Sequence, residues 1–316
     1  MRALPSGGRR VTAGSFLGLP RVEPATMPAG AADAAILGIP HGVPYPDPGL
    51  TAGCAEAPAA IRARSQRLAP FVGNHDFDLD GPTLPPDSAF RLVDAGDVDG
   101  RPDDGPGNLE RAEAAVASLL AAGVVPLVLG GDDSIPIPVL RAYAGHGPLT
   151  VLQVDAHLDF RHEVEGVREG YSSPMRRAAE LGHVGQIVQV GLRGVGSARP
   201  EDVADARQAG NLLVTARELG ERGVPWLTER LAADASVFVA FDCDGLDPAV
   251  LPAVSGTAPG GLTYDQAADL LGGVATRCRV VGAAFTELVP SLDTNGLSSL
   301  VVVRLLMRLV GAMARR

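Results

Sequence analysis

The chain has 316 residues, of which 46% are hydrophobic and 20% are charged, and its formal net charge is −10. These values are those of an ordinary globular protein with enough material for one large α/β domain. The acidic balance argues against nucleic acid or an anionic membrane as a partner. It suits a cationic substrate or a metal ion, although an acidic surface commonly serves solubility alone.

Cysteine usage and hydropathy predict a cytoplasmic location. The chain contains three cysteines without the spacing of metal ligands, namely Cys54, Cys243 and Cys278. They are expected to be reduced core residues. No apolar run follows the arginines near the N-terminus, so neither a signal peptide nor a membrane anchor is predicted. The longest apolar stretch, residues 297–313, is interrupted by two arginines and predicts a terminal helix that is too short and too charged to span a bilayer.

In chain order, segments with strand and helix patterns alternate. Residues 1–30, rich in Gly, Pro and Arg, show no periodicity and predict an arm or a disordered segment, followed by a single domain over residues 31–316. Strands are expected at 34–39, 91–95, 124–129, 149–154, 187–192, 237–241 and 280–285. Helices are expected at 55–66, 108–122, 174–181, 200–209, 216–233, 264–276 and 297–313. This alternation specifies an α/β fold, with a parallel sheet and helices on both faces.

Three of the predicted strands end abruptly in acidic residues. Residues 149–154 lead into Asp155-Ala156-His157-Leu158-Asp159, residues 237–241 into Asp242-Cys243-Asp244, and residues 124–129 into Gly130-Gly131-Asp132-Asp133. Alternation along a strand places alternate acidic side chains on the same side. Ligands of parallel sheets bind beyond the carboxyl ends of the strands, where all three runs and Glu287 fall. Burying unpaired carboxylates together is costly, so a function is expected there.

The donors of these runs favour a metal site. They are Asp133, Asp155, His157, Asp159, Asp242 and Asp244. Six donors with carboxylates that can bridge are enough for two divalent ions, and an Asp-rich set with one imidazole suits a hard cation. The alternative is that Asp and Gly are ordinary turn residues after strands. For any single run the two interpretations are evenly balanced, but the joint occurrence of three such runs favours the metal site.

The three acidic runs resemble the metal-binding signatures of the ureohydrolases, the arginase and agmatinase family. The resemblance covers nearly the whole chain and includes residues 37–40, 58–62, 259–262 and 285–290. Within the family the chain looks closer to agmatinases than to arginases, because residues 174–178 resemble an agmatinase segment. The resemblance implies a three-layer arginase-like fold and a homo-oligomer, either a trimer or a hexamer.

The resemblance also implies an activity and roles for individual residues. Two Mn²⁺ ions per chain would hold a hydroxide that attacks the guanidinium carbon, giving urea and an amine, which is hydrolysis of a C–N bond in a linear amidine. Asp155 and Asp242 would be bridging ligands, and the other four donors would complete the site. Glu287 would pair with the substrate guanidinium, Tyr171 would contact the substrate, and catalytic roles fall to Asp159, Glu287 and Tyr171. Agmatine, 4-guanidinobutyrate, 3-guanidinopropionate or a guanidino group on a larger natural product would be the substrate.

Two positions depart from the family pattern. Asp133 stands where the family has histidine, which makes the site one charge more negative and favours a hard ion such as manganese or magnesium. Tyr171 aligns with a loop histidine, and its reference pKa of about 10 makes it a poorer proton shuttle at neutral pH. Two other functions therefore remain open: a related metal-dependent amide hydrolase of the deacetylase type, and a non-catalytic binding protein that retains the fold.

Overall fold

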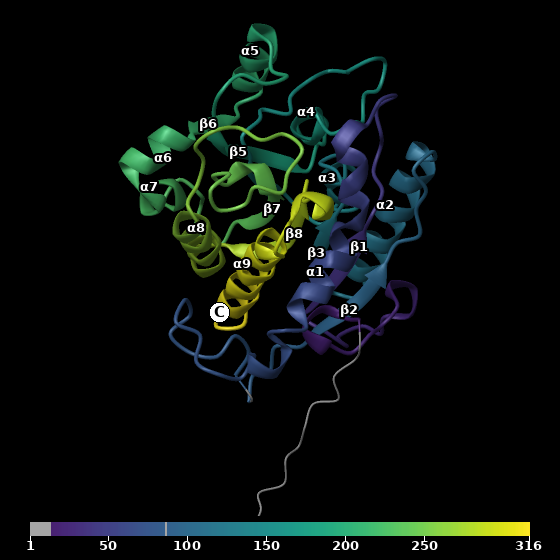
Figure 1. Ribbon diagram of the computed structural model, residues 1–316, viewed down its shortest axis with the longest axis vertical. Coiled ribbons are helices and arrows are strands. Elements are labelled where there is room, and N and C mark those ends of the chain that lie inside the picture. The colour runs from purple at the N-terminus through teal and green to yellow at the C-terminus, as the bar shows by residue number, and fades with distance from the viewer. Residues whose placement is uncertain (1–13, 86) are drawn as a thin grey trace, which may run out of the picture.

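The computed structural model describes residues 14–85 and 87–316, and in this range eight strands form one sheet (Figure 1). The strand order is β2-β1-β3-β8-β7-β4-β5-β6, and every neighbouring pair is parallel. The strands are β1 (Ala34–Ile39), β2 (Leu92–Asp97), β3 (Val125–Gly130), β4 (Leu149–Val154), β5 (Val184–Leu192), β6 (Leu212–Thr215), β7 (Ser236–Asp242) and β8 (Arg279–Thr286). The predicted parallel sheet is confirmed.

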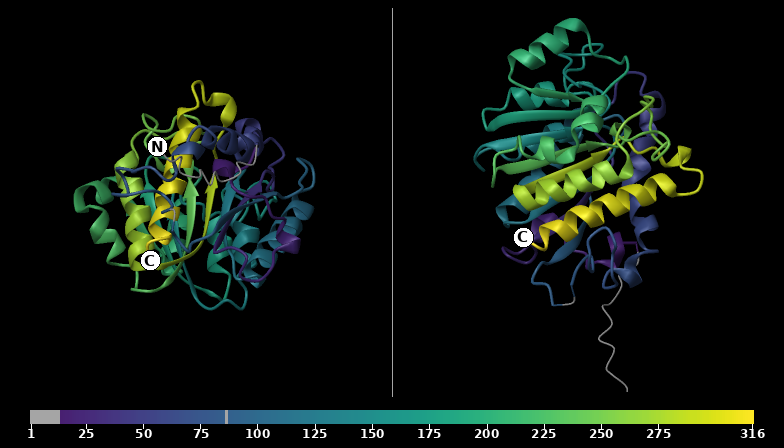
Figure 2. Two further views of the ribbon diagram at one scale, coloured as in Figure 1. Left: turned by 90° about the horizontal axis from the view of Figure 1, so that it is seen from below. Right: turned by 90° about the vertical axis from the view of Figure 1, so that its left-hand side faces the viewer.

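Helices cover both faces of the sheet, which gives the predicted three layers (Figure 2). They are α1 (Ala57–Ser65), α2 (Gly105–Ala121), α3 (Pro136–Arg141), α4 (Pro174–Ala179), α5 (Pro200–Gln208), α6 (Ala216–Arg222), α7 (Val224–Thr228), α8 (Tyr264–Arg277) and α9 (Leu297–Met313). Residues of α1 and α6 to α9 belong to the buried cluster on one face, and residues of α2 to α5 belong to the cluster on the other.

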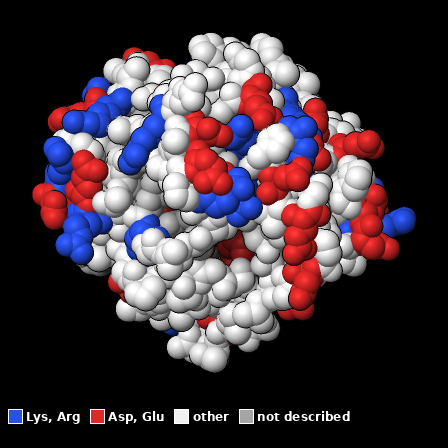
Figure 3. Space-filling model, turned by 90° about the horizontal axis from the view of Figure 1, so that it is seen from above, with Lys and Arg blue, Asp and Glu red and all other residues white. Residues whose placement is uncertain are grey.

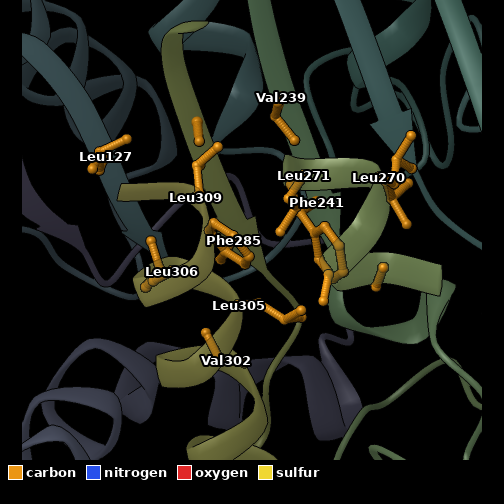
Figure 4. Packing of buried hydrophobic residues seen from close by; sticks show 14 of the residues in the cluster. Leu127, Val239, Phe241, Leu270, Leu271, Phe285, Val302, Leu305, Leu306 and Leu309 are labelled. Atoms are coloured by element: carbon orange, nitrogen blue, oxygen red, sulfur yellow. The ribbon is translucent and has the colours of Figure 1, made fainter. Parts of the chain in front are cut away.

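Apolar side chains of the central strands pack against α8 and α9 (Figure 4). Phe241 of β7 and Phe285 of β8 are buried and stack with ring centroids 5.0 Å apart. Leu270 and Leu271 approach them from α8, and Leu305 lies on α9. Burying a Leu or Phe side chain contributes about 1.5–3 kcal/mol. This packing fixes the middle of the sheet, whose strand ends carry the acidic residues.

Two short elements were not predicted from the sequence. Strand β6 has only four residues, Leu212–Thr215, and forms the edge of the sheet next to β5. Helix α3 follows directly after the acidic run of β3 and contains Pro136 and Pro138. Two prolines within six residues are typical of a loop, but at the first turn of a helix proline costs little because the missing N–H has no partner there.

The helix predicted over residues 216–233 is wrong in its extent. The structure has two short helices, α6 and α7, separated by Gly223. Gly223 has φ 81°, a left-handed conformation that ends a right-handed helix, and Pro225 then starts the next helix. Gly223 and Pro225 are the signal in the sequence for this break.

The described part of the predicted N-terminal arm, residues 14–30, packs on the domain rather than extending away from it. Phe16 is fully buried, and its backbone N–H donates to the Asp94 carboxylate over 2.6 Å. The Leu17 N–H donates to the Ser65 hydroxyl over 2.8 Å. Residues 1–13 of this arm lie outside the described residues.

Two further expectations from the sequence concern membrane-spanning helices and the cysteines. None of the helices in residues 14–85 and 87–316 is long and apolar enough to cross a membrane. All three cysteines are buried and free, as the sequence predicted.

Candidate active site

The four central strands of the sheet deliver acidic residues to the same edge. Strands β3, β8, β7 and β4 are consecutive neighbours, and Leu129 pairs with Phe285, Asp242 with Thr286, and Val154 with Phe241. The residues that follow at this edge are Asp133, Glu287, Asp242, Asp244 and Asp155, and each of these side chains is at least 95% buried. The predicted meeting of the three acidic runs and Glu287 is therefore realised by the order of the strands.

The backbone at this edge adopts conformations that direct the side chains into the site. Asp159 has φ 46° and Glu287 has φ 64°, in the left-handed region that costs a non-glycine residue about 1–3 kcal/mol. Gly131 allows close approach of the chain, because a Cβ there would lie 2.2 Å from the Pro40 carbonyl oxygen. The Glu287 N–H donates to the Gly131 carbonyl over 2.9 Å, which ties the end of β8 to the end of β3.

Five of the six predicted donors form two compact groups. Asp155, His157 and Asp244 make one group, and Asp133, Asp155 and Asp242 make the other, each with ligand atoms within 4.8 Å of one another. Asp155 is common to both groups within the described part of the chain. Two groups that share a carboxylate are what a bridged pair of cations requires.

Short contacts hold these donors together. His157 Nδ1 lies 2.9 Å from Asp244 Oδ2 and 3.6 Å from Asp155 Oδ1. The Ala156 N–H donates to Asp244 Oδ1 over 3.1 Å, and the Asp244 N–H donates to Asp242 Oδ1 over 2.7 Å. Backbone donors therefore hold the carboxylates of β7 toward the run that follows β4.

Asp159 belongs to neither compact group, although it lines the same cavity. It is buried, and the neighbouring charge of Asp155 adds to burial in raising its pKa. The structure therefore places this predicted ligand beside the two groups rather than inside one of them.

Glu287 lies in the cavity with both oxygens held by donors. The Asp133 N–H donates to Oε1 over 2.9 Å, and the Ser255 hydroxyl donates to Oε2 over 2.7 Å. The Cys54 thiol lies 3.7 Å from Oε2. Ser255 was not predicted from the sequence, because its loop carries no pattern that distinguishes it from an ordinary turn. The carboxylate is thus oriented before any ligand arrives.

Tyr171 forms part of the cavity wall. Its ring packs against Tyr45 with centroids 4.3 Å apart, a contact that the sequence did not indicate. Burial, then the neighbouring Tyr45 and Glu287, raises the pKa of Tyr171 to about 12. Its hydroxyl therefore keeps its proton at neutral pH and acts as a hydrogen-bonding group rather than as a base.

The buried carboxylates resist ionisation when no cation is present. Burial, then the charge of Asp244, raises the pKa of Asp155 to about 6, and burial, then the charge of Asp132, raises the pKa of Glu287 to about 8. The pKa values of Asp133 and Asp242 are also raised, by burial and by neighbouring carboxylates. Hydrogen bonds to Asp155 and Asp244 raise the pKa of His157 to about 10. The site therefore favours added positive charge.

The residues present fit divalent cations. Asp133 Oδ1 accepts from the Thr286 hydroxyl over 2.5 Å, whereas its Oδ2 is buried without a hydrogen-bond partner among the described residues. Oxygen donors with one imidazole suit a hard or borderline ion such as manganese. A buried oxygen without a partner is costly unless a cation or water occupies the position next to it. Asp133, the departure from the family pattern, is thus directed into the site as a ligand would be.

A cavity of about 180 Å³ gives access to these residues. Its lining includes Asp133, Asp159, Asp242, Asp244 and Glu287, together with uncharged residues of three loops. Figure 3 shows a hollow near the middle of one face of the molecule, with acidic residues at its floor and mostly uncharged residues around its lower rim. A small cation can reach buried carboxylates of this kind from solvent.

The raised pKa values predict how stability depends on pH. The folded, metal-free protein holds protons on Asp155, His157 and Glu287 that the unfolded chain releases at lower pH, so these groups stabilise the fold at low pH and lose that effect as pH rises. We expect the melting temperature of metal-free protein to fall between about pH 5 and 8, and the gain on adding Mn²⁺ to grow over the same interval. Scanning calorimetry with and without metal measures both. If the increase in melting temperature on adding Mn²⁺ becomes smaller as pH rises, these groups do not bind the metal ion.

Comparison with known proteins identifies the family and the fold of this chain. Residues 32–311 match the sequence model of the Arginase family. The mitochondrial agmatinase of Gallus gallus is 31% identical over 293 residues, which cover 91% of this chain and 83% of that protein. The solved structure of proclavaminate amidinohydrolase from Streptomyces clavuligerus superposes with a TM-score of 0.83 at 29% identity, covering 98% of this chain and 99% of that one. Formiminoglutamase from Trypanosoma cruzi, solved with Mn²⁺, gives a TM-score of 0.79 at 26% identity, covering 96% and 99%.

The sheet order, the strand-end carboxylates and these matches define a metal-binding hydrolase with a three-layer α/β fold. The chain belongs to the arginase family. It is an enzyme of the amidinohydrolase class, which acts on carbon–nitrogen bonds of guanidino compounds, as the resemblance of the three acidic runs implied.

Proposed function

We propose that this enzyme depends on two Mn²⁺ ions and hydrolyses a small guanidino compound, such as agmatine or 4-guanidinobutyrate, to urea and an amine. The observation that carries the proposal is the position of Glu287. Its oriented carboxylate lies in the same cavity as both groups of cation-binding side chains. A planar guanidinium prefers a carboxylate with two oxygens, so Glu287 can hold the reacting carbon beside the cation site.

Asp133, Asp155, His157, Asp159, Asp242 and Asp244 would hold the ions. When bound, divalent ions would lower the pKa of a water molecule, so that hydroxide would be available for attack on the guanidinium carbon near neutral pH. The chain itself provides the substrate contacts. Glu287 binds the guanidinium through Oε1 and Oε2, and Tyr171 donates a hydrogen bond from the cavity wall.

Proton transfer is proposed for Asp159. Hydrolysis adds water across the carbon–nitrogen bond, so one proton must reach the nitrogen of the departing amine. Asp159 is buried and lines the cavity, and its pKa is raised by burial and by Asp155. A carboxyl group whose pKa is raised above its ordinary value takes up a proton more readily than an exposed carboxyl group, and it can return that proton to a more basic nitrogen. Tyr171, with a pKa of about 12, is less suited to that task.

The substrate is proposed to be small, because the cavity measures about 180 Å³. The relatives named above act, by their names, on chemically different compounds, so membership of the family does not choose among substrates. The test is a urea-release assay with Mn²⁺-loaded protein over agmatine, 4-guanidinobutyrate and 3-guanidinopropionate, with acetylated amines in parallel. We expect urea from at least one guanidino compound. Acetate release from the acetylated amines without any urea would support the deacetylase alternative instead.

We also propose that the enzyme is a homo-oligomer in the cytoplasm, a trimer or a hexamer. Two exposed aromatic side chains support the assembly: Phe71 is 55% exposed and Phe77 is 92% exposed on the same segment. Exposed apolar groups that lie close together are typical of surfaces that contact another protein. Three free cysteines are compatible with a reducing compartment.

A further inference from the structure

A chain of three buried side-chain amides runs through the sheet to the acidic site. Asn211 precedes β6, Gln189 lies on β5 and Gln153 lies on β4, and these three strands are neighbours. Gln153 pairs directly with Gln189 in the register of β4 and β5. Gln153 and Gln189 are fully buried, and Asn211 is 9% exposed. We refer to Asn211, Gln189 and Gln153 as the amide chain.

Three hydrogen bonds link the members of the amide chain to one another and to the Asp155 carboxylate. Asn211 Nδ2 donates to Gln189 Oε1 over 2.8 Å, and Gln189 Nε2 donates to Gln153 Oε1 over 2.6 Å. Gln153 Nε2 then donates to Asp155 Oδ2 over 2.6 Å. Gln189 Nε2 also donates to the Leu158 carbonyl over 2.6 Å. The amide chain therefore reaches one candidate ligand directly and the backbone between two others, His157 and Asp159.

The direction of the amide chain follows from the chemistry of its last member. An ionised carboxylate only accepts hydrogen bonds, so Gln153 must present its NH₂ group to Asp155. Its carbonyl oxygen then faces Gln189, which must donate in turn, and Asn211 must donate to Gln189. Because these groups are buried, a reversed amide would bring two acceptors together in a site of low dielectric, which is costly.

We propose that Gln153 is a positioning residue, which through the amide chain holds Asp155 for cation binding. Asp155 is common to both cation-binding groups, so its orientation affects both ions. Hydrogen-bond partners behind a metal ligand commonly change metal affinity about 10–100-fold when they are removed. This inference rests on the proposed metal centre.

The test is an isothermal calorimetric titration of full-length, metal-free protein with Mn²⁺ alone, which measures the affinity for the metal ion. The variant is Gln153→Met, which keeps the length of the side chain and removes its donor and acceptor. We expect this variant to bind Mn²⁺ at least about tenfold more weakly than the wild type at both sites, with the far-UV circular dichroism unchanged. The matched control is Gln186→Met on the neighbouring strand β5. The Gln186 side chain is half-buried and faces the side opposite to Gln189, so this variant should bind Mn²⁺ as the wild type does.

A second variant, Asn211→Asp, keeps the inference testable if Gln153→Met does not fold. A carboxylate at position 211 cannot donate to Gln189 Oε1, so the first bond of the amide chain is lost two strands away from Asp155. We expect Mn²⁺ binding to weaken several-fold in this variant. Wild-type Mn²⁺ affinity in folded Gln153→Met, or in Asn211→Asp if the first variant does not fold, would overturn the role of the amide chain. Wild-type protein that binds no Mn²⁺ would instead overturn the metal centre itself, so the two failures are distinct.

Discussion

Glu287→Gln is expected to remove most turnover while leaving metal content and folding intact. The amide keeps the shape of the side chain and its backbone conformation, including the φ of 64°. Its oxygen can still accept from the Asp133 N–H, and its NH₂ group can donate to the Ser255 hydroxyl. What is lost is the negative charge that faces the guanidinium. Breaking a buried charge-assisted pair costs about 2–5 kcal/mol, so kcat/KM should fall on the order of 100-fold or more.

The control for this experiment is Ser255→Ala, which removes one hydrogen bond to Glu287 Oε2 and keeps the charge. The neutral hydrogen bond from Ser255 contributes less to catalysis than the negative charge of Glu287, so Ser255→Ala should lose activity by a smaller factor than Glu287→Gln. Steady-state kinetics with Mn²⁺-saturated protein measures both variants. Wild-type turnover in Glu287→Gln would mean that the guanidinium binds elsewhere.

Asp155→Ala is expected to lose both metal ions and with them the activity. Asp155 is shared by the two cation-binding groups, and no other ligand joins them in the described part of the chain. Removing the hydrogen-bond partner of a ligand already weakens binding about 10–100-fold, so removing the shared ligand itself should weaken both sites by more than about 100-fold. Titration with Mn²⁺ and a urea-release assay on the same sample measure the two effects.

Asp132→Asn is the matched control for the shared ligand. Asp132 is also a buried carboxylate in the run after β3, but it belongs to neither cation-binding group and accepts hydrogen bonds from Ser134 instead. The amide keeps the size of the side chain, so Asp132→Asn should still bind two ions. An Asp155→Ala protein that retains one tightly bound ion would show that the two groups do not depend on a common carboxylate.

The meeting of the acidic runs could be predicted because each run is local in sequence. An apolar segment followed at once by aspartates marks the carboxyl end of a buried strand, and parallel pairing brings such ends to one edge. Asp133 belongs to one of these runs, so its position at the edge of the sheet followed from the same pattern. The fold class followed from the same alternation of segments.

Contacts between distant loops could not be predicted in this way. Ser255 and Tyr45 approach Glu287 and Tyr171 only after folding, and nothing in their own segments marks them. Gln153 was different, because a polar residue in the otherwise apolar end of β4 is a signal that a buried partner exists. The partner, Asp155, lies only two residues away, but the rest of the amide chain depends on the pairing of β4 with β5.

We propose that four neighbouring strand ends form a site for two divalent ions. Elemental analysis of wild-type protein purified in the presence of Mn²⁺, after removal of free metal, tests it most directly. We expect close to two manganese ions per chain, and protein that retains none under these conditions would contradict the two-ion site.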